Sequence, residues 1–192
     1  MERIPAHPKP KWELEQYLTP SPIASALVWT AFIQGAIEER RVADLGCGTG
    51  RLCAGVAMLG GNCTCVDVDR DSLEVGRDAF RELELEADFV EADCTEFHGK
   101  FDTVVQNPPF GQVKRGIDLK FLRTAMNMAK VIYSIHKSNP DSRNLITREA
   151  QTRGFSVEVI PLSYPMTPYY PWHREKVHKF LVDIYVFRKV TG

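Results

Sequence analysis

A glycine-rich turn between an apolar strand and a helix constrains the fold more than any other feature of this sequence. Gly46, Gly48 and Gly50 follow the apolar residues 41–45 and precede a helical pattern over residues 51–59. Glycines at such a place let the backbone turn sharply and approach a nucleotide-like ligand closely. The turn therefore predicts a strand–turn–helix unit with a ligand site at the end of the strand. Dinucleotide enzymes and plain tight turns share this pattern, so the turn alone does not identify the ligand.

Strands and helices alternate along the rest of the chain. Alternation of this kind is typical of a parallel sheet covered on both faces, and two final strands without a helix between them predict an antiparallel pair. The predicted fold class is α/β and Rossmann-like, with a mostly parallel seven-stranded sheet, helices on both faces and an antiparallel final strand. Strands are expected at 41–45, 62–66, 88–91, 101–106, 131–136, 156–162 and 180–188, with helices at 51–59 and 71–83 and three more that begin near 21, 117 and 140.

The length predicts a single domain. A chain of 192 residues with 44% hydrophobic positions forms one well-built core and is too short for two ordinary domains. Residues 1–11 are rich in proline and lysine, which excludes a helix and predicts a flexible segment that is extended or disordered. The domain is expected at 12–192. Its first helix is expected to have Ser21 as N-cap and Pro22 as the first helical residue.

Charge and composition exclude several classes of protein. A net charge of -1 excludes a protein that coats nucleic acid through charge alone, so a nucleic acid partner must bind a local patch. No apolar run is long enough for a membrane span, and the opening residues do not resemble a signal peptide. The five cysteines lack the paired spacing of a zinc site, which predicts reduced thiols, no bound metal and a cytoplasmic protein.

Acidic residues follow the ends of the first three strands. Asp44 precedes the glycines, where a carboxylate suits a cationic ligand better than a phosphate. Asp67 ends the second strand, about 20 residues after the turn, where an acid can accept hydrogen bonds from both hydroxyls of a ribose. Asp93 and the backbone of Cys94 follow the third strand and are expected to bind an adenine amino edge. The alternative is that all three acids are helix caps and turn residues, as expected for nearby Asp69 and Ser72.

The tetrapeptide Asn107-Pro108-Pro109-Phe110 ends the fourth strand and carries the predicted chemistry. An adenine N6 amine is a poor nucleophile because its lone pair is delocalised into the ring. The side-chain carbonyl of Asn107 and the backbone carbonyl of Pro108 can accept both N6 hydrogens and draw the lone pair out of conjugation. The prolines stiffen the loop, and Phe110 offers a face for an extruded base. The alternative is an Asn-Pro turn that only closes a strand.

Together these motifs predict a methyltransferase that uses S-adenosylmethionine and acts on N6 of an adenine in structured RNA. Other planar amines stay open as substrates: guanine N2 in RNA, adenine in DNA, or a glutamine side chain of a protein. The absence of a separate target-recognition domain disfavours a sequence-specific DNA enzyme. A non-catalytic cofactor-binding adaptor is a further alternative, which the intact tetrapeptide disfavours.

The order of several segments resembles the methyltransferase-like protein five family, which modifies one adenine of small-subunit ribosomal RNA. The resemblance runs from about Trp12 to Arg188. It is carried by the segments KWELEQYLTP, VADLGCGTG with AMLGG, VDVDRDSLE, FDTVVQNPPFG, GIDLKFLRTAMNMA and VIYSIHKS, of which LEQY and YSIHKS are the narrowest signals. The segment QVKRGID lacks the asparagine-rich form of relatives, and Thr49 stands where some relatives have cysteine.

The resemblance implies a class I methyltransferase fold and assigns roles to individual residues. Gln16 and Thr19 would close over the cofactor, and Gly46, Thr49 and Arg51 would surround its methionine part. Asp67 would bind the ribose, Asp93 and Cys94 the adenine, and residues 107–110 the target base. The resemblance also implies a heterodimer with a small zinc-binding activator protein that adds a strand to the sheet edge.

Basic and aromatic residues near the expected site are candidates for RNA contacts. Lys114 and Arg115 follow the tetrapeptide, and Lys137 follows the fifth strand, so these side chains can line a phosphate track or form an ordinary charged surface. A loop over residues 165–173 contains Tyr169, Tyr170 and Trp172, which stack on bases or pack under the loop. His136 and His98 lack metal spacing and are expected to be structural.

Overall fold

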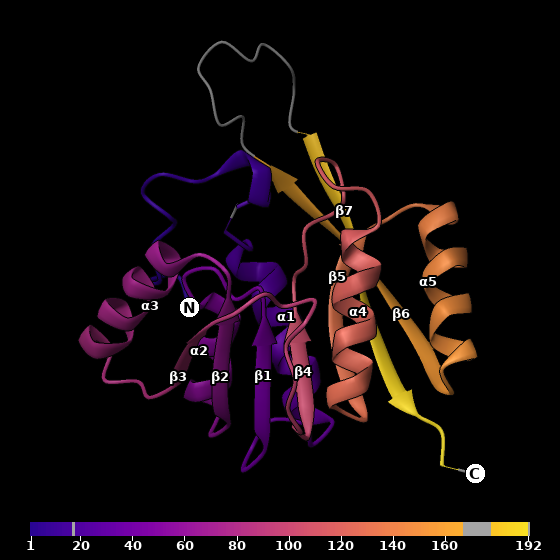
Figure 1. Cartoon of the computed structure of the whole chain (residues 1–192), viewed down its shortest axis with the longest axis horizontal. Coiled ribbons are helices and arrows are strands. Elements are labelled where there is room, and N and C mark those ends of the chain that lie inside the picture. Colours follow the sequence, from indigo (N-terminus) through magenta and orange to yellow (C-terminus); the bar gives the residue numbers. More distant parts are fainter. Residues whose placement is uncertain (17, 167–177, 192) are drawn as a thin grey trace.

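The computed structural model describes residues 1–16, 18–166 and 178–191 (Figure 1). The aromatic loop with Tyr169, Tyr170 and Trp172 lies outside the described residues. The helices are a 3-10 turn at Trp12–Leu14, α1 (Ser21–Ile33), α2 (Arg51–Met58), α3 (Arg70–Glu82), α4 (Ile117–Met128) and α5 (Pro140–Thr152). The strands are β1 (Arg41–Leu45), β2 (Asn62–Asp67), β3 (Asp88–Glu91), β4 (Thr103–Gln106), β5 (Val131–Lys137), β6 (Phe155–Met166) and β7 (His178–Lys189).

The strands form one seven-stranded sheet in the order β3-β2-β1-β4-β5-β7-β6. The first five strands are parallel, and β7 lies antiparallel between β5 and β6 (Figure 1). The predicted fold class is therefore confirmed, including the antiparallel end. The strand order reverses direction between β1 and β4, so the carboxyl ends of these two neighbouring strands lie side by side at one edge of the sheet. Open α/β sheets bind their ligands at this point of the fold.

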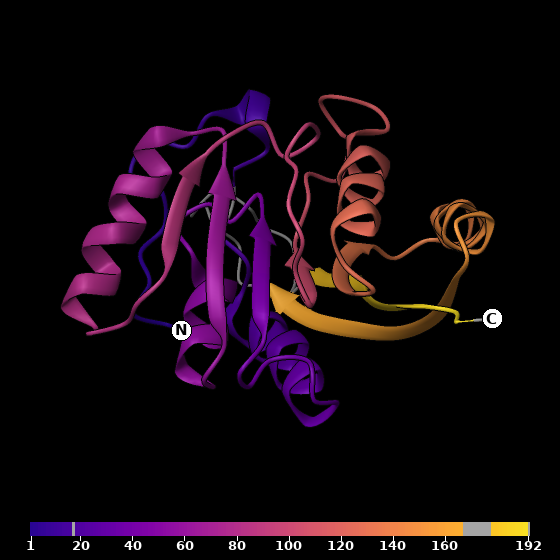
Figure 2. The same ribbon diagram turned by 60° about the horizontal axis from the view of Figure 1, so that its bottom comes forward.

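Helices cover both faces of the sheet, as Figure 2 shows. One apolar cluster lies between the sheet and helices α1 and α2, and a second lies between the sheet and helices α4 and α5. Neighbouring residues of a strand contribute to opposite clusters, for example Val104 and Val105 of β4. This alternation explains the continuous apolar runs of the central strands. None of the described helices is long and apolar enough to cross a membrane.

The first helix begins one residue earlier than predicted, at Ser21 and not at Pro22. Ser21 is the first helical residue, and Pro20 is the N-cap, without a side-chain cap. The reason is backbone geometry: Pro20 has extended dihedral angles, and its carbonyl accepts the first helical hydrogen bond from Ala24 N at 2.9 Å. Ser21 as N-cap is therefore wrong, whereas Asn139 does cap α5, because its side chain accepts from Ser142 N at 2.8 Å.

Residues 1–11 contain no helix and have turns or bends at residues 2–4 and 8–9. They also pack on the domain, since Ile4 is only 1% exposed and belongs to the apolar cluster of α1 and α2. The carbonyls of Ile4 and Pro5 accept hydrogen bonds from Arg51 and Thr49, just after the glycine turn. Sequence patterns do not reveal this packing, because a single apolar residue in a proline-rich run has no periodicity.

The burial of Ile4 predicts a cost for its truncation. Ile4→Ala is expected to lower the free energy of unfolding by about 2–4 kcal/mol, because it removes buried methyl groups and leaves a cavity. Urea denaturation of this variant and of the matched exposed variant Arg3→Ala measures the effect. A flexible opening segment would instead make both variants indistinguishable from the parent chain.

Candidate active site at the carboxyl edge of the sheet

The glycine turn leaves β1 in a conformation that only glycine adopts without strain. Gly46, Gly48 and Gly50 have φ angles of +70°, +56° and +93°. A Cβ at Gly46 would lie 2.9 Å from the ring of Phe121, and one at Gly50 would lie 3.1 Å from Phe80. At Gly48, by contrast, no atom lies within 4 Å of an added Cβ. The backbone at Gly48 is therefore open on the side from which a ligand approaches.

Asp67 links the turn to the end of β2. Its two carboxylate oxygens accept hydrogen bonds from the backbone N–H groups of Gly48 and Asp69, each at 2.9 Å. Burial raises the pKa of Asp67, and the two backbone hydrogen bonds oppose that rise. Cys94 supports the same turn, because its Sγ lies 3.2 Å from the backbone N–H of Gly46, which donates to it. The structure thus brings the turn, Asp67 and Cys94 together.

Asp44 occupies a different position from the one that its charge suggested. It is 1% exposed, and its Oδ2 accepts from the backbone N–H of Cys53 in the first turn of α2 at 3.1 Å. Burial raises the pKa of Asp44 well above its ordinary value, and the nearby Cys63 adds to the rise. Its Oδ1 is buried and has no hydrogen-bond partner. The observed contact of Asp44 is with the start of α2, beneath the turn.

Asp93 is exposed after β3. Its Oδ1 accepts from the backbone N–H and the hydroxyl of Thr95, at 2.8 and 2.7 Å. These hydrogen bonds lower the pKa of Asp93. An ionised carboxylate at this position can accept a hydrogen bond from an exocyclic amine.

An N-terminal strap, defined as residues 1–16, 18 and 19, lies along the carboxyl edge of the sheet. Gln16 Nε2 donates to Asp69 Oδ2 at 2.7 Å, and Thr19 accepts from Arg51 Nη1 through its carbonyl at 2.8 Å. Thr49 donates its hydroxyl hydrogen to the carbonyl of Pro5 at 2.5 Å. The predicted cofactor residues Gln16, Thr19, Thr49 and Arg51 therefore meet at the strap. Their observed partners are strap, turn and β2-end residues.

Asp69 is the main anchor of the strap, a role that the sequence does not reveal. Its carboxylate accepts from Lys11 Nζ at 2.7 Å and from Gln16, and His7 Nε2 lies 2.8 Å from it. Burial raises the pKa of Asp69, but the hydrogen bonds from Lys11, Gln16 and Ser72 lower it far more, so the net shift is downward. Asp69 is the N-cap residue of α3 as predicted, although its side chain makes no cap hydrogen bond there.

The tetrapeptide begins directly after β4 and places Asn107 against the strap. Asn107 Nδ2 donates to Thr19 Oγ1 at 2.9 Å. Its Oδ1 is buried and has no hydrogen-bond partner. With its nitrogen on Thr19, the amide presents its oxygen as a buried acceptor that no described residue uses. Pro108 is buried, and Phe110 is partly buried against the apolar cluster of α1 and α2.

Glu15 is a second residue of the site that the sequence pattern does not predict. Its two carboxylate oxygens accept from the backbone N–H groups of Gly111 and Gln112, each at 3.2 Å. Glu15 has a left-handed backbone with φ +49°, which turns its side chain out of the 3-10 segment. These contacts join residues almost 100 positions apart, and no local pattern reports them. The strap therefore holds both ends of the tetrapeptide, through Thr19 and through Glu15.

The basic candidates for RNA contacts are all exposed. Lys114 and Arg115 lie in the loop between the tetrapeptide and α4, and the charge of Lys114 contributes to the lowered pKa of Asp93. Lys137 is the last residue of β5, also at the carboxyl edge. All three side chains are thus available on the side of the molecule that carries the site.

Three cysteines converge in the core although their spacing suggests no metal site. The Sγ atoms of Cys53, Cys63 and Cys65 lie within 4.8 Å of one another, and all are buried. All five cysteines are free thiols. Three thiolates enclosed in this core next to Asp44 would concentrate negative charge at low dielectric, which disfavours an ion with these ligands. The absence of a metal stays a prediction.

The anchoring role of Asp69 predicts a pH-dependent stability. Because its folded-state pKa is lowered, the stabilising contribution is present above about pH 4, the ordinary value, and is lost as the pH falls below it. Asp69→Asn is expected to lower the free energy of unfolding by about 1–2 kcal/mol at pH 7. The difference from the parent chain should shrink at pH 3, as measured by urea denaturation. Asp78→Asn, an exposed acid on α3, is the control, and an equal loss at both pH values would contradict this role of Asp69.

Comparison with known proteins identifies the family of this chain. Residues 23–131 match the methyltransferase small domain. The rRNA N(6)-adenosine-methyltransferase METTL5 of Danio rerio is 37% identical and is aligned over 97% of this chain and 94% of its own length. The rRNA N(6)-adenosine-methyltransferase Mettl5 of Drosophila melanogaster is 34% identical and is aligned over 97% of this chain and 92% of its own length. A crystal structure from Pyrococcus horikoshii, assigned to the RNA methyltransferases, has a TM-score of 0.90 and 35% identity and covers 99% of this chain and 94% of its own. The chain therefore belongs to the methyltransferase small domain family and, within it, to the METTL5 family.

Proposed function

We propose that this protein transfers the methyl group of S-adenosylmethionine to N6 of one adenosine in small-subunit ribosomal RNA. The observation that carries the proposal is the amide of Asn107, whose nitrogen is held by Thr19 while its buried oxygen has no partner. A buried acceptor without a partner is costly, and a ligand that donates a hydrogen there relieves the cost. The relatives named as rRNA N(6)-adenosine methyltransferases support adenine as that ligand.

The residues at the carboxyl edge fit the cofactor. Gly48 offers open backbone at the turn, and the Asp67 carboxylate lies beside it at the end of β2 for the ribose hydroxyls. Asp93 has one carboxylate oxygen bonded to Thr95, and the other oxygen is the proposed acceptor for the adenine amine. Gly46, Gly50, Thr49, Arg51, Gln16, Thr19 and Cys94 complete the proposed cofactor site, with Asp44 beneath the turn. When bound, the cofactor supplies an activated methyl group on a sulfonium.

The chain itself contributes position and electrostatics. Asn107 Oδ1 and the carbonyl of Pro108 accept the two N6 hydrogens, which orients the amine and raises electron density on its nitrogen. Pro109 stiffens the loop, and Phe110 provides an aromatic face for the base, a contact worth about 1–3 kcal/mol. No side chain has to act as a nucleophile, because a positioned amine reacts through proximity. Glu15 and Thr19 of the strap hold the loop in place for this task.

The RNA backbone is proposed to follow the basic residues of the same edge. Lys114, Arg115 and Lys137 are exposed there and can contact phosphates. Such contacts set position and affinity, whereas the tetrapeptide selects the base. The free thiols support action in a reducing compartment such as the cytoplasm.

The base is identified by nucleoside analysis. Purified protein is incubated with tritiated S-adenosylmethionine and total ribosomal RNA, and the RNA is digested to nucleosides. Label is expected in N6-methyladenosine. Label in methylguanosine, or only in protein, would contradict the adenine assignment and retain the fold.

Asn107→Ala tests the tetrapeptide in the same assay. The variant is expected to lose at least about 100-fold in kcat, as measured for other lost oriented hydrogen-bonding groups, while the Kd for S-adenosylmethionine stays within about threefold. Asn144→Ala, an exposed asparagine on α5, is the matched control and is expected to behave as the parent chain. A kcat unchanged by Asn107→Ala would refute the role of this residue.

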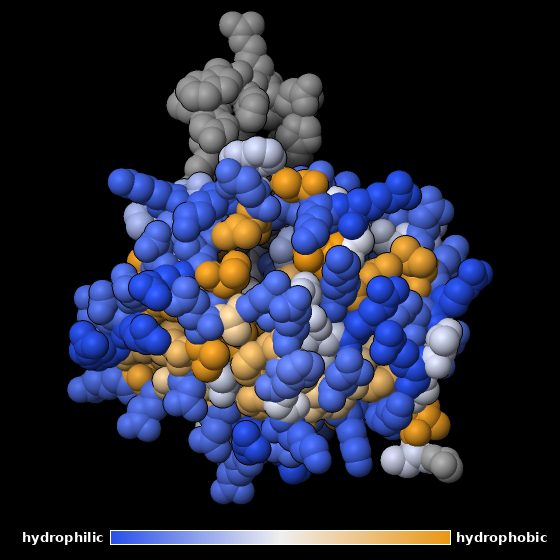
Figure 3. Space-filling view, in the orientation of Figure 1, coloured by the Kyte–Doolittle hydropathy of each residue, from blue (hydrophilic) through white to orange (hydrophobic). Residues whose placement is uncertain are grey.

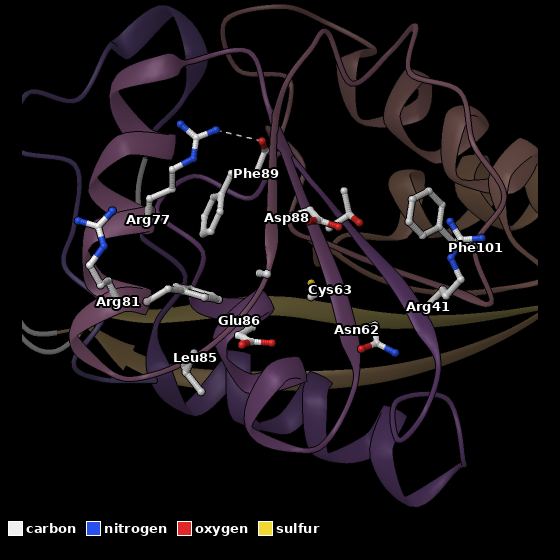
Figure 4. Close-up of a pocket in the computed structure, with 13 residues that line it drawn as sticks. Arg41, Asn62, Cys63, Arg77, Arg81, Leu85, Glu86, Asp88, Phe89 and Phe101 are labelled. Carbon is white, nitrogen blue, oxygen red and sulfur yellow. Dashed lines mark hydrogen bonds between the residues drawn. The ribbon is translucent and has the colours of Figure 1, made fainter.

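We also propose the zinc-binding activator protein as a partner at the β3 edge. β3 pairs only with β2 in the sheet. Next to it lies a cavity of about 720 Å³, where Phe80, Leu85 and Phe89 are flanked by Arg77 and Arg81 (Figure 4). The face seen in Figure 3 likewise carries apolar areas among its hydrophilic side chains. The cavity reaches the first residues of β1, β2 and β3, so a partner bound there leaves the carboxyl edge accessible.

One backbone amide of β3 provides a sharp test of strand addition. Ala92 N donates to Asp67 O of β2, so by alternation Glu91 N–H points away from the sheet. Glu91→Pro removes this donor and leaves the pairing with β2 intact, whereas Glu91→Ala loses the same side chain and keeps the donor. With the activator, Glu91→Pro is expected to lose at least about tenfold in affinity by calorimetry relative to Glu91→Ala. Equal affinities would place the partner elsewhere.

A further inference from the structure

A buried chain of polar side chains lies directly behind the tetrapeptide. Gln106, the last residue of β4, donates from Nε2 to Ser134 Oγ at 3.0 Å. Ser134 Oγ lies 2.7 Å from His136 Nε2, and His136 Nδ1 lies 3.6 Å from Asp118 Oδ2. Gln106 and Ser134 are fully buried, and His136 is 1% exposed. Ser134 and His136 belong to the YSIHKS segment, which the proposed reaction has not used so far.

The chain joins the two ends of the loop that carries the target site. Gln106 immediately precedes Asn107, and Asp118 lies in the first turn of α4, where the loop ends. Gln106 and Ser134 are register partners on the parallel strands β4 and β5. The polar chain therefore ties the start of the loop to β5 by a hydrogen bond. At the end of the loop, His136 Nδ1 is buried without a hydrogen-bond partner and lies 3.6 Å from Asp118 Oδ2.

Serine, histidine and aspartate in this order resemble the constellation of a hydrolase, but burial excludes that use. Ser134 is 0% exposed, so no substrate reaches its hydroxyl. Tyr185 closes the other side, since its ring packs edge-on against His136 with centroids 5.2 Å apart. A nucleophile must meet its substrate, whereas a buried hydrogen-bonded chain orients what lies next to it.

The amide orientation of Gln106 in the structure sets the roles of the other members of the chain. Gln106 N–H donates to Ser134, so the Ser134 hydroxyl hydrogen is free to donate to His136 Nε2. His136 then carries its proton on Nδ1, on the side of Asp118. Gln106 Oε1 is buried without a partner, which means that the amide is held through its nitrogen alone. Loss of the Ser134 contact would leave the Gln106 side chain without the one hydrogen bond that the described residues give it.

We propose that Ser134 and His136 are positioning residues for Asn107, acting through Gln106, with Asp118 as the charged neighbour of His136. The inference rests on the proposed function, in which Asn107 and Pro108 hold the target amine. The chain touches neither the base nor the cofactor residues, so it affects the rate of methyl transfer and not the affinity for either ligand. A displacement of about 1 Å at a reacting group is enough for a large loss of rate.

The test compares two replacements of His136 that keep different parts of the ring. The amide of glutamine reaches the place of Nε2 and can accept from Ser134, whereas the shorter asparagine keeps a polar group only near Nδ1. His136→Asn and Ser134→Ala are expected to lower kcat by about 10-fold to 100-fold, with KM for RNA and Kd for S-adenosylmethionine within about twofold. The kcat of His136→Gln is expected to be at least about fivefold higher than that of His136→Asn. His98→Asn and Ser156→Ala, at exposed positions, are the matched controls.

The outcomes separate this inference from the proposed function. If the parent chain forms no labelled N6-methyladenosine, the proposed function fails. If the parent chain is active and His136→Asn matches His136→Gln, the positioning role is wrong. The role is also wrong if Ser134→Ala keeps its kcat, or if kcat and cofactor affinity fall together with the melting temperature, which is the behaviour of a purely structural residue.

Discussion

Everything in this molecule depends on the parallel strands ending at one edge of the sheet. β1 and β4 are parallel neighbours, and the strand order reverses between them. The glycine turn after β1 and the tetrapeptide after β4 therefore lie at the same edge of the sheet. Asp67 arrives there from β2 in register with β1. Backbone topology thus brings the proposed cofactor residues and the tetrapeptide to one edge of the sheet.

The N-terminal strap packs against this edge of the sheet. Its residues reach Asp69 after β2, Arg51 after the glycine turn, and Asn107 and Gly111 around the tetrapeptide. One segment therefore contacts both the proposed cofactor side and the proposed base side. Behind the crevice, the chain from Gln106 to His136 supports the same loop from within the sheet. The tetrapeptide is therefore contacted by the strap on one side and supported by the polar chain of the sheet on the other.

Local patterns predict most of the fold and the ligand-facing motifs, but not the contacts between them. The predicted bounds of β1 and β3 are confirmed. Glu15 and Asp69 escape such reasoning, since their partners lie far away in the chain or in a segment without periodicity. The charge of Asp44 predicts a role toward a cationic ligand, which stays a prediction, whereas its burial beneath α2 is a property of packing that charge does not reveal. The sequence predicts the motifs at the ends of the strands, but it does not predict the distant residues that hold these motifs in place.

A crystal structure with S-adenosylhomocysteine tests the central claim most directly. We predict that the ribose hydroxyls lie within hydrogen-bond distance of Asp67 and that the sulfur faces Asn107 Oδ1. The space between them should fit one methyl group and one amino group, in line with reacting atoms about 3–3.5 Å apart. A ligand bound in the cavity beside β3, or a sulfur turned away from Asn107, would contradict the claim that one edge of the sheet holds both reactants.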